Sequence, residues 1–249
     1  MQERLPDTAY QNLHHFISHS PWDYLGVMGE VSRQMAASLA FLPEPCGLIL
    51  DESGWRKSGK KSVGVVRQYL GNVGKVDNGQ VGVFGVLCKG DKVGLVGGYL
   101  YLSKEWTQDA ARCEAAGVPK SERHYRTKAE LAIQIVKGLV GNATYDWVGG
   151  DAQYGNSPGL RQFLQETGRA FVLDVGESLG VYLSNPAPYV PTKEDGRGRT
   201  PTRYKSDQKP VLLKNLLSTL PADQWQTLVH RRGTKGPLKR QALLLDVWV

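Results

Sequence analysis

The chain has 249 residues, of which 41% are hydrophobic and 22% are charged, and its formal net charge at pH 7 is +7. This length supports one sizeable core, with or without a smaller inserted part. The sequence contains no run of 18 apolar residues and no signal-peptide pattern, so we expect neither a membrane span nor a membrane partner.

The three cysteines are Cys46, Cys88 and Cys113, an odd number at wide spacing and without a C-x-x-C pair. This pattern favours reduced thiols over a disulfide framework or a zinc site. We therefore expect a cytoplasmic location.

The positive charge is concentrated in the last quarter of the chain. Residues 1–192 contain 19 Lys/Arg and 19 Asp/Glu, whereas residues 193–249 contain 12 and 5. A basic segment joined to a neutral part suggests a polyanionic partner, most simply nucleic acid. The alternative is an ordinary solvated basic surface.

The first predicted elements are two helices within residues 7–42, where apolar side chains recur at helical spacing. The first should end near Ser18. Ser20 followed by Pro21 predicts the N-cap and first residue of the second, which Pro43 should stop.

Three strands are predicted next. Residues 46–51 form a short apolar run that ends in Asp51 and predicts a buried strand. A polar, basic loop should follow over residues 52–61. Residues 81–88 and 93–102 predict a hairpin with its turn at 89–92.

Helices and strands then alternate, which predicts parallel strands. Thr127 and Glu130 have the spacing of a capping box. The predicted elements are a short helix within 106–117, a helix over 127–140, a strand over 145–149 that points at Asp151, a helix from Ser157-Pro158 to Gly168 and a strand over 170–175.

The sequence changes character after Val175. Residues 176–210 are rich in Pro, Gly, Lys and Arg, with weak periodicity. A short helix over 212–220 and strands over 225–229 and 243–249 are predicted. We expect a separate, basic and β-rich subdomain here.

Five segments, in order along the chain, carry a family resemblance. They are Tyr10–Asp23, Asp51-Glu-Ser-Gly-Trp-Arg-Lys57-Ser-Gly59 continuing through residues 62–69, residues 71–83, Gly150-Asp151-Ala-Gln-Tyr154-Gly155, and Arg232-Gly-Thr-Lys-Gly-Pro237. Together they resemble the DDE transposase domain of a group of bacterial insertion sequences and its flanking helical segment. No single segment would suffice.

The order of predicted elements, three strands and then helix, strand, helix, strand, is that of an RNase H-like domain. We therefore expect an α/β fold with an RNase H-like mixed sheet and flanking helices, plus a β-rich basic insertion subdomain. The predicted parts are a helical segment over 1–45, a catalytic core over 46–176 and the insertion over 177–249. This fold would place Asp51 and Asp151 at neighbouring strand ends.

The resemblance implies the chemistry of DNA transposition, in which water cuts a phosphodiester and the freed 3′-hydroxyl attacks target DNA. It implies that Asp51 bridges two Mg²⁺ or Mn²⁺ ions and that Asp151 binds one of them. Without the resemblance, a solvated acid at a strand end is the simpler interpretation of each. Glu52 should face away from Asp51 on an extended chain.

The implied partners are transposon-end DNA and target DNA, and a homo-oligomer is a further expectation. Phosphate contacts position a duplex on a protein. The predicted phosphate-binding residues are Lys57, Lys60, Lys61 and Arg67, with an ordinary solvated loop as the alternative. Tyr154 either packs in the core or contacts DNA, and Gly155 should serve a tight turn.

The family's third acid is a glutamate on a helix after the insertion, in a basic, aromatic motif. That motif is not found here, so weak or no activity is expected. Two alternatives are a non-catalytic DNA-binding remnant and an RNase H-like nuclease unrelated to transposition. The candidates for the third acid after the fifth strand are Glu177, Glu194, Asp195, Asp207, Asp223 and Asp246.

Overall fold

The computed structural model describes residues 9–21, 23–192, 200–234 and 236–249. The chain forms two compact units, Met1–Asp174 and Val175–Val249. The predicted functional division at residues 45 and 176 stays a prediction.

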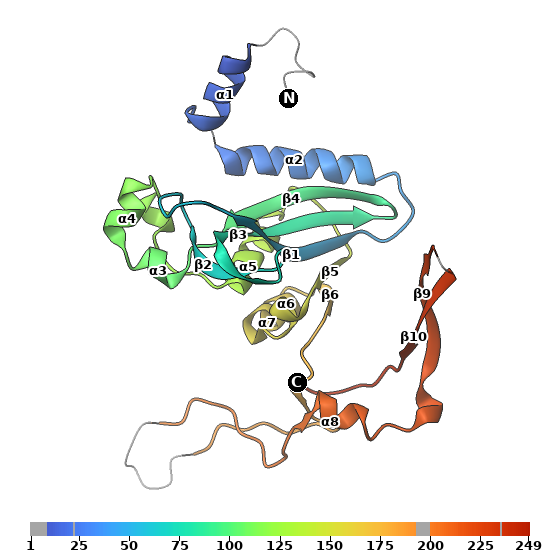
Figure 1. Ribbon diagram of the computed structural model, residues 1–249. Coiled ribbons are helices and arrows are strands. Elements are labelled where there is room, and N and C mark those ends of the chain that lie inside the picture. Colours follow the sequence, from blue (N-terminus) through green and yellow to red (C-terminus); the bar gives the residue numbers. More distant parts are fainter. Residues whose placement is uncertain (1–8, 22, 193–199, 235) are drawn as a thin grey trace. The chain divides into compact units, whose positions relative to one another are not determined.

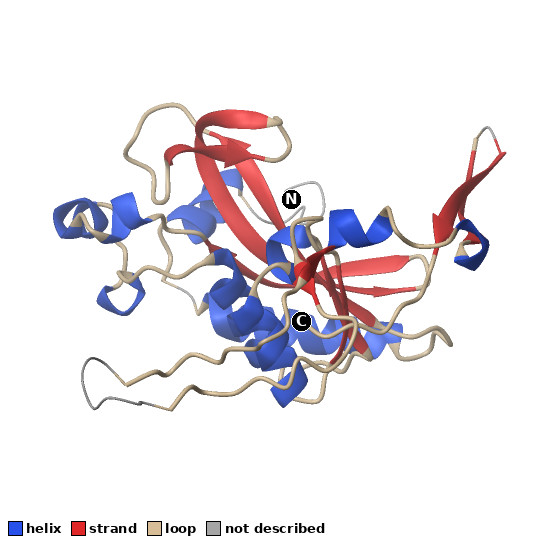
Figure 2. Ribbon diagram, turned by 90° about the horizontal axis from the view of Figure 1, so that it is seen from below, coloured by secondary structure: helices blue, strands red, loops and turns tan. Residues whose placement is uncertain are grey.

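The first unit is built on a six-stranded mixed sheet (Figures 1 and 2), with the order β2-β3-β1-β5-β6 and with β4 also paired to β3. β1 pairs antiparallel with β3 and parallel with β5, and β5 pairs parallel with β6. The predicted meander followed by parallel strands is therefore confirmed. The strands are β1 (Gly47–Arg56), β2 (Val66–Leu70), β3 (Lys75–Lys89), β4 (Lys92–Leu100), β5 (Trp147–Gly150) and β6 (Ala170–Leu173).

One strand prediction is wrong, and one strand was not predicted. β1 does not end at Asp51 but continues through Arg56, because residues 52–56 pair with residues 79–83 of β3. The polar stretch after Asp51 is therefore strand, and the loop begins only at Lys57. β2 was not predicted, since its five residues form a strand by pairing with the start of β3.

Two helices precede the sheet, α1 (Tyr10–Ser18) and α2 (Tyr24–Leu39). The end of α1 at Ser18 is as predicted. The predicted start of the second helix at Ser20-Pro21 is wrong: the N-cap is Asp23, whose carboxylate accepts the backbone N–H of Leu25 at 3.1 Å. α2 runs along β4 (Figure 1), where the buried Ser32 donates to the carbonyl of Val96 at 2.8 Å.

The remaining helices of the first unit connect the strands. The capping box is confirmed: the Glu130 carboxylate accepts the N–H of Thr127 at 2.6 Å, and the Thr127 hydroxyl accepts the N–H of Glu130 at 3.2 Å. The N–H of Thr127, and its hydroxyl at 2.8 Å, both donate to the Glu130 carboxylate and hold the pKa of Glu130 below its usual range. The helices are α3 (Lys104–Thr107), α4 (Ala110–Ala115), the 3-10 turn η2 (Lys120–Glu122), α5 (Lys128–Gly138), α6 (Ala152–Gly155) and α7 (Pro158–Glu166).

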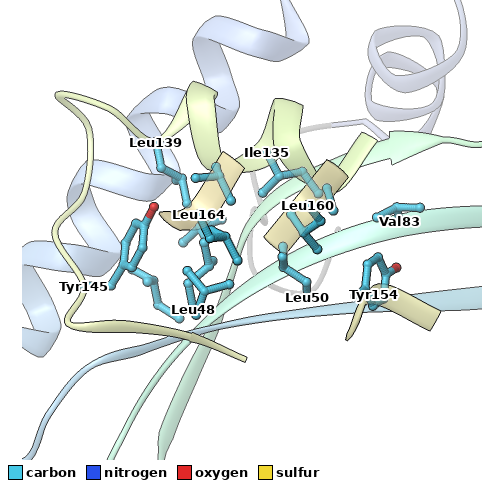
Figure 3. Packing of buried hydrophobic residues seen from close by; sticks show 14 of the residues in the cluster. Leu48, Leu50, Val83, Ile135, Leu139, Tyr145, Tyr154, Leu160 and Leu164 are labelled. Atoms are coloured by element: carbon cyan, nitrogen blue, oxygen red, sulfur yellow. The ribbon is translucent and has the colours of Figure 1, made fainter. Parts of the chain in front are cut away.

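The main core lies between one face of the sheet and helices α5 and α7 (Figure 3). Leu48 and Leu50 of β1 are fully buried there against Ile135, Leu160 and Leu164. The close approach of α5 requires glycine in the sheet. A Cβ at Gly85 or Gly97 would lie 2.5 Å or 2.8 Å from Cγ2 of Ile135.

Gly155 makes a second close approach. It ends α6, and a Cβ there would overlap the carbonyl oxygen of Asp174. Gly155 ends a single helical turn without a positive φ, and the constraint on this position is space. We expect Gly155→Ala to lower the free energy of unfolding by about 1–3 kcal/mol, measured by urea denaturation. Gly138→Ala is the matched control, since a Cβ there meets nothing within 4 Å. An equal loss in both variants would contradict this account.

The second unit consists of short elements and a hairpin, as expected of a β-rich part. The predicted strand over 243–249 is wrong: the hairpin partner of β9 is β10, and the last residues make only a bridge between Tyr182 and Trp248. Residues 193–199, which include Glu194 and Asp195, lie outside the described residues. The elements are β7 (Gly180–Val181), β8 (Val211–Leu212), α8 (Leu213–Leu217), the 3-10 turn η3 (Ala222–Gln224), β9 (Gln226–Gly233) and β10 (Gly236–Ala242).

None of the helices in the described ranges is both long enough and apolar enough to cross a membrane.

Candidate active site

Asp51 and Asp151 occupy neighbouring positions on two parallel strands. The last register pair between β1 and β5 is Leu50 with Gly150; Asp51 is the next residue of β1, and Asp151 directly follows the end of β5. Adjacent strands lie ~4.8 Å apart. The structure therefore brings together the two residues that the sequence singled out, at the point where β5 ends and β1 continues paired with β3 only.

Local hydrogen bonds orient both carboxylates. Asp151 caps helix α6, and its Oδ1 accepts the N–H of Gln153 at 2.9 Å. Oδ1 of Asp51 accepts the N–H of Glu52 at 2.7 Å. Both residues are exposed, and within the described part of the chain neither forms an ion pair. In each aspartate, therefore, Oδ2 takes no part in these hydrogen bonds.

Tyr154 lies beneath this pair. Its side chain is fully buried in the main core next to Leu50 (Figure 3), so of the two roles considered for it, packing is the correct one. Burial raises the pKa of its phenol, and the negative charges of Glu52, Asp51 and Asp151 raise it further. Its hydroxyl has no hydrogen-bond partner among the described residues.

Glu52 turns toward α5, away from Asp51, as the alternation of a strand predicts. Its Oε1 accepts from Nζ of Lys128 at 2.7 Å, and the two side chains are only 19% and 17% exposed. Lys128 also lies 5.7 Å from the ring centroid of Tyr101. Burial, then hydrogen bonding to Tyr125, raises the pKa of Tyr101 to about 12. Glu52 is therefore engaged in a largely buried ion pair with Lys128.

The acids considered as third ligands are not gathered at this pair. In the described ranges no group of three or more His, Cys, Asp or Glu side chains could hold a metal ion. Glu177, Asp207, Asp223 and Asp246 belong to the second unit, and Asp207 accepts a hydrogen bond from the hydroxyl of Tyr189 at 3.1 Å. The prediction that Asp246 lies in a strand is wrong.

Sequence reasoning missed Asp174. It directly follows β6, whose last register pair joins Leu173 to Gly150, and it is exposed. Asp174 thus occupies the same edge as Asp151, one strand farther from Asp51. The signal was present: like Leu-Ile-Leu-Asp51, Phe-Val-Leu-Asp174 is an apolar run closed by an aspartate.

The predicted phosphate-binding residues lie on the segment after β1 and on β2. Lys57, Lys60 and Lys61 are exposed in the segment after β1, and Arg67 is exposed on β2. Lys57 lies six positions after Asp51 along an extended chain, a distance of up to roughly 20 Å. The role of these basic residues in phosphate binding stays a prediction.

Two hollows of the first unit do not include the acid pair. One of about 390 Å³ lies between β4 and residues 117–126, with the Glu122–Arg126 ion pair at its lining. The other, of about 360 Å³, is apolar and is lined by Trp55 and Phe84. The acid pair is instead an open sheet edge, which suits a large polymeric substrate better than an enclosed small molecule.

The donor set at this edge suits a hard divalent cation. Carboxylate oxygens are the protein ligands of Mg²⁺, which is commonly held by one or two carboxylates, with waters and substrate phosphates completing the shell. Asp51 and Asp151 are adjacent, exposed and free of ion pairs with the described residues, so they fit such an ion.

Comparison with known proteins gives a family match and a relative. A family model described as DDE superfamily endonuclease matches residues 1–237. A probable transposase for insertion sequence element IS701 from Microchaete diplosiphon is 36% identical to the chain over 153 residues. The matched stretch is 59% of this chain and 35% of that relative, so the chain spans about a third of the relative's length.

Proposed function

The chain belongs to the DDE superfamily of endonucleases, and on that premise we propose that it carries the two-aspartate part of a transposase active site acting on DNA. The observation that most directly supports this proposal is the parallel register of β1 with β5, which sets Asp51 beside Asp151. The similarity to a probable insertion-sequence transposase favours transposon ends and target DNA as substrates.

The proposed roles of the side chains follow from charge and position. Asp51 and Asp151 hold Mg²⁺ or Mn²⁺ at the sheet edge. Divalent ions at such a site, when bound, activate the attacking oxygen and stabilise the leaving oxygen of a phosphodiester. Lys57, Lys60, Lys61 and Arg67 hold DNA phosphates away from the reacting bond. The bonds to Glu52 N–H and Gln153 N–H keep both carboxylates oriented for their task.

We expect the 249-residue chain by itself to cut DNA weakly or not at all. Two carboxylates bind metal less tightly than three, and within the described residues no three acids form a metal-binding group. A further carboxylate would complete the site.

A second candidate function is DNA binding without catalysis. It is favoured by the excess of Lys/Arg over Asp/Glu in residues 193–249, 12 against 5. A third is a nuclease unrelated to transposition, which the fold alone would permit.

One experiment separates these functions. The chain and its Asp51→Asn variant are incubated with a duplex of the DNA that flanks the gene and with a scrambled duplex, in Mg²⁺, in Mn²⁺ and in EDTA. The proposal predicts metal-dependent binding or slow nicking that favours the flanking duplex and is lost in Asp51→Asn. Salt-sensitive binding that survives both EDTA and the substitution would establish the non-catalytic function. Metal-dependent cleavage without preference would establish the nuclease.

A further inference from the structure

The segment of residues 57–65 joins β1 to β2 and is here called the basic loop. Its three lysines, Lys57, Lys60 and Lys61, are all exposed. Among the described residues none of them forms an ion pair. Their ammonium groups are therefore available to an anionic partner.

The backbone of the basic loop is fixed from the protein side. The side-chain amide of Asn78 donates to the carbonyls of Lys57 and Gly59, at 2.6 Å and 2.8 Å. Nη2 of Arg112 donates to the carbonyls of Lys60 and Val65, at 2.9 Å each. Three further side chains donate to carbonyls of the loop: Gln80 to that of Val63, Gln68 to that of Gly64 and Trp106 to that of Val65.

Arg112 is itself held in place. Its guanidinium stacks 3.9 Å from the ring centroid of Trp106 and is 3.3 Å from the carboxylate of Glu105. Trp106 is fully buried in a small second core with Cys113 and Val118. Val65, which is 1% exposed, anchors the far end of the loop. Arg112 is thus a rigid donor rather than a free surface cation.

These contacts have an electrostatic consequence. Carbonyl oxygens carry partial negative charge and would repel phosphate if they faced outward. Six carbonyls of the basic loop are instead bound by donors from the protein, at Lys57, Gly59, Lys60, Val63, Gly64 and Val65. A loop ordered in this way loses little conformational entropy when it binds a partner.

We propose that the basic loop is a pre-formed clamp for the sugar-phosphate backbone of duplex DNA, and that Asn78 and Arg112 are its positioning residues. The inference rests on the proposed function, because it takes the duplex to be the one presented to Asp51 and Asp151. The distance of up to roughly 20 Å from Asp51 to the loop corresponds to about six base-pair steps. The clamp therefore binds the duplex to one side of the reacting phosphate.

The test uses the full chain and a duplex of the DNA that flanks the gene. Hydrogen exchange of the loop amides and DNA affinity by fluorescence anisotropy are measured for Asn78→Ala and Arg112→Lys, the second of which keeps the charge. Both variants should exchange these amides about tenfold faster and bind DNA about three- to tenfold more weakly. Their Mn²⁺ affinity should be unchanged. Asn72→Ala, an exposed asparagine in the turn between β2 and β3, should match the parent chain in all three measurements.

The lysines are tested separately through the salt dependence of binding. In the double variant Lys60→Ala/Lys61→Ala, the plot of log affinity against log salt should be less steep by roughly one to two. Each lost phosphate contact removes about 0.9 from the steepness. An unchanged slope, with the parent chain still binding DNA, would overturn the clamp and leave the proposed function standing. Unchanged exchange and affinity in Asn78→Ala and Arg112→Lys would overturn the positioning role. Absence of any DNA binding by the parent chain would overturn the proposed function together with the clamp.

Discussion

Asp51→Asn and Asp151→Asn are each expected to lower the affinity of the chain for Mn²⁺ by at least about tenfold, or about 1.4 kcal/mol. Each change removes a negative charge and a hard oxygen ligand from the same sheet edge, where each residue directly follows one member of the register pair Leu50–Gly150. The fold should be little disturbed, because both residues are exposed and the asparagine oxygen can still accept the local N–H bond. Electron paramagnetic resonance of free Mn²⁺ during a titration measures the affinity directly.

Asp174→Asn is the matched control for both substitutions. Asp174 is exposed and ends the strand next to β5, but lies one strand farther from Asp51. We expect it to change Mn²⁺ affinity less than either of the other two. If all three substitutions weakened binding equally, Asp174 would be a third ligand and the two-acid site would be wrong. Unchanged affinity in Asp51→Asn and Asp151→Asn would remove the metal site altogether.

Local pattern was sufficient to predict the parts of the fold in which sequence and packing agree. The capping box at Thr127 and the runs before Asp51 and Asp151 are examples, since caps and apolar runs are local signals. β2 and the second half of β1 were not predictable in this way. Their residues are polar or mixed, and they form strands only because β3, up to 31 positions away in the chain, provides the hydrogen-bonding partner.

The same limit applies to the site. Asp51 and Asp151 were found because their motifs lie in continuous sequence. The bond from Lys128 to Glu52 spans 76 positions and those from Arg112 to the basic loop span 47 and 52. No periodicity or spacing reports such contacts. Asp174 was missed for a different reason. The strand was predicted over residues 170–175, which includes Asp174, whereas β6 ends at Leu173.

Tyr154 offers a separate test of how the acid pair is supported. Tyr154→Ala is expected to lower the free energy of unfolding by about 3–5 kcal/mol, because it empties a fully buried aromatic site in the main core beneath Asp51. Tyr154→Phe should be neutral or slightly stabilising, because the hydroxyl that it removes is buried and has no partner in the described structure. Urea denaturation at pH 7 measures both.

The pH dependence of the same variants sharpens the test. The pKa of Tyr154 is raised on folding, first by burial and then by the charges of Glu52, Asp51 and Asp151. A raised pKa contributes stability that is complete below the unfolded value of about 10 and is lost as the pH rises above it. Tyr154→Phe should therefore lose less stability than the parent chain between pH 9 and about 11. Part of the loss should remain, because Tyr101 and Tyr145 also have raised pKa values. If Tyr154→Phe destabilised the chain by as much as Tyr154→Ala at pH 7, the hydroxyl would have to be hydrogen-bonded in solution, and a bond to one of the three carboxylates would be the first to seek.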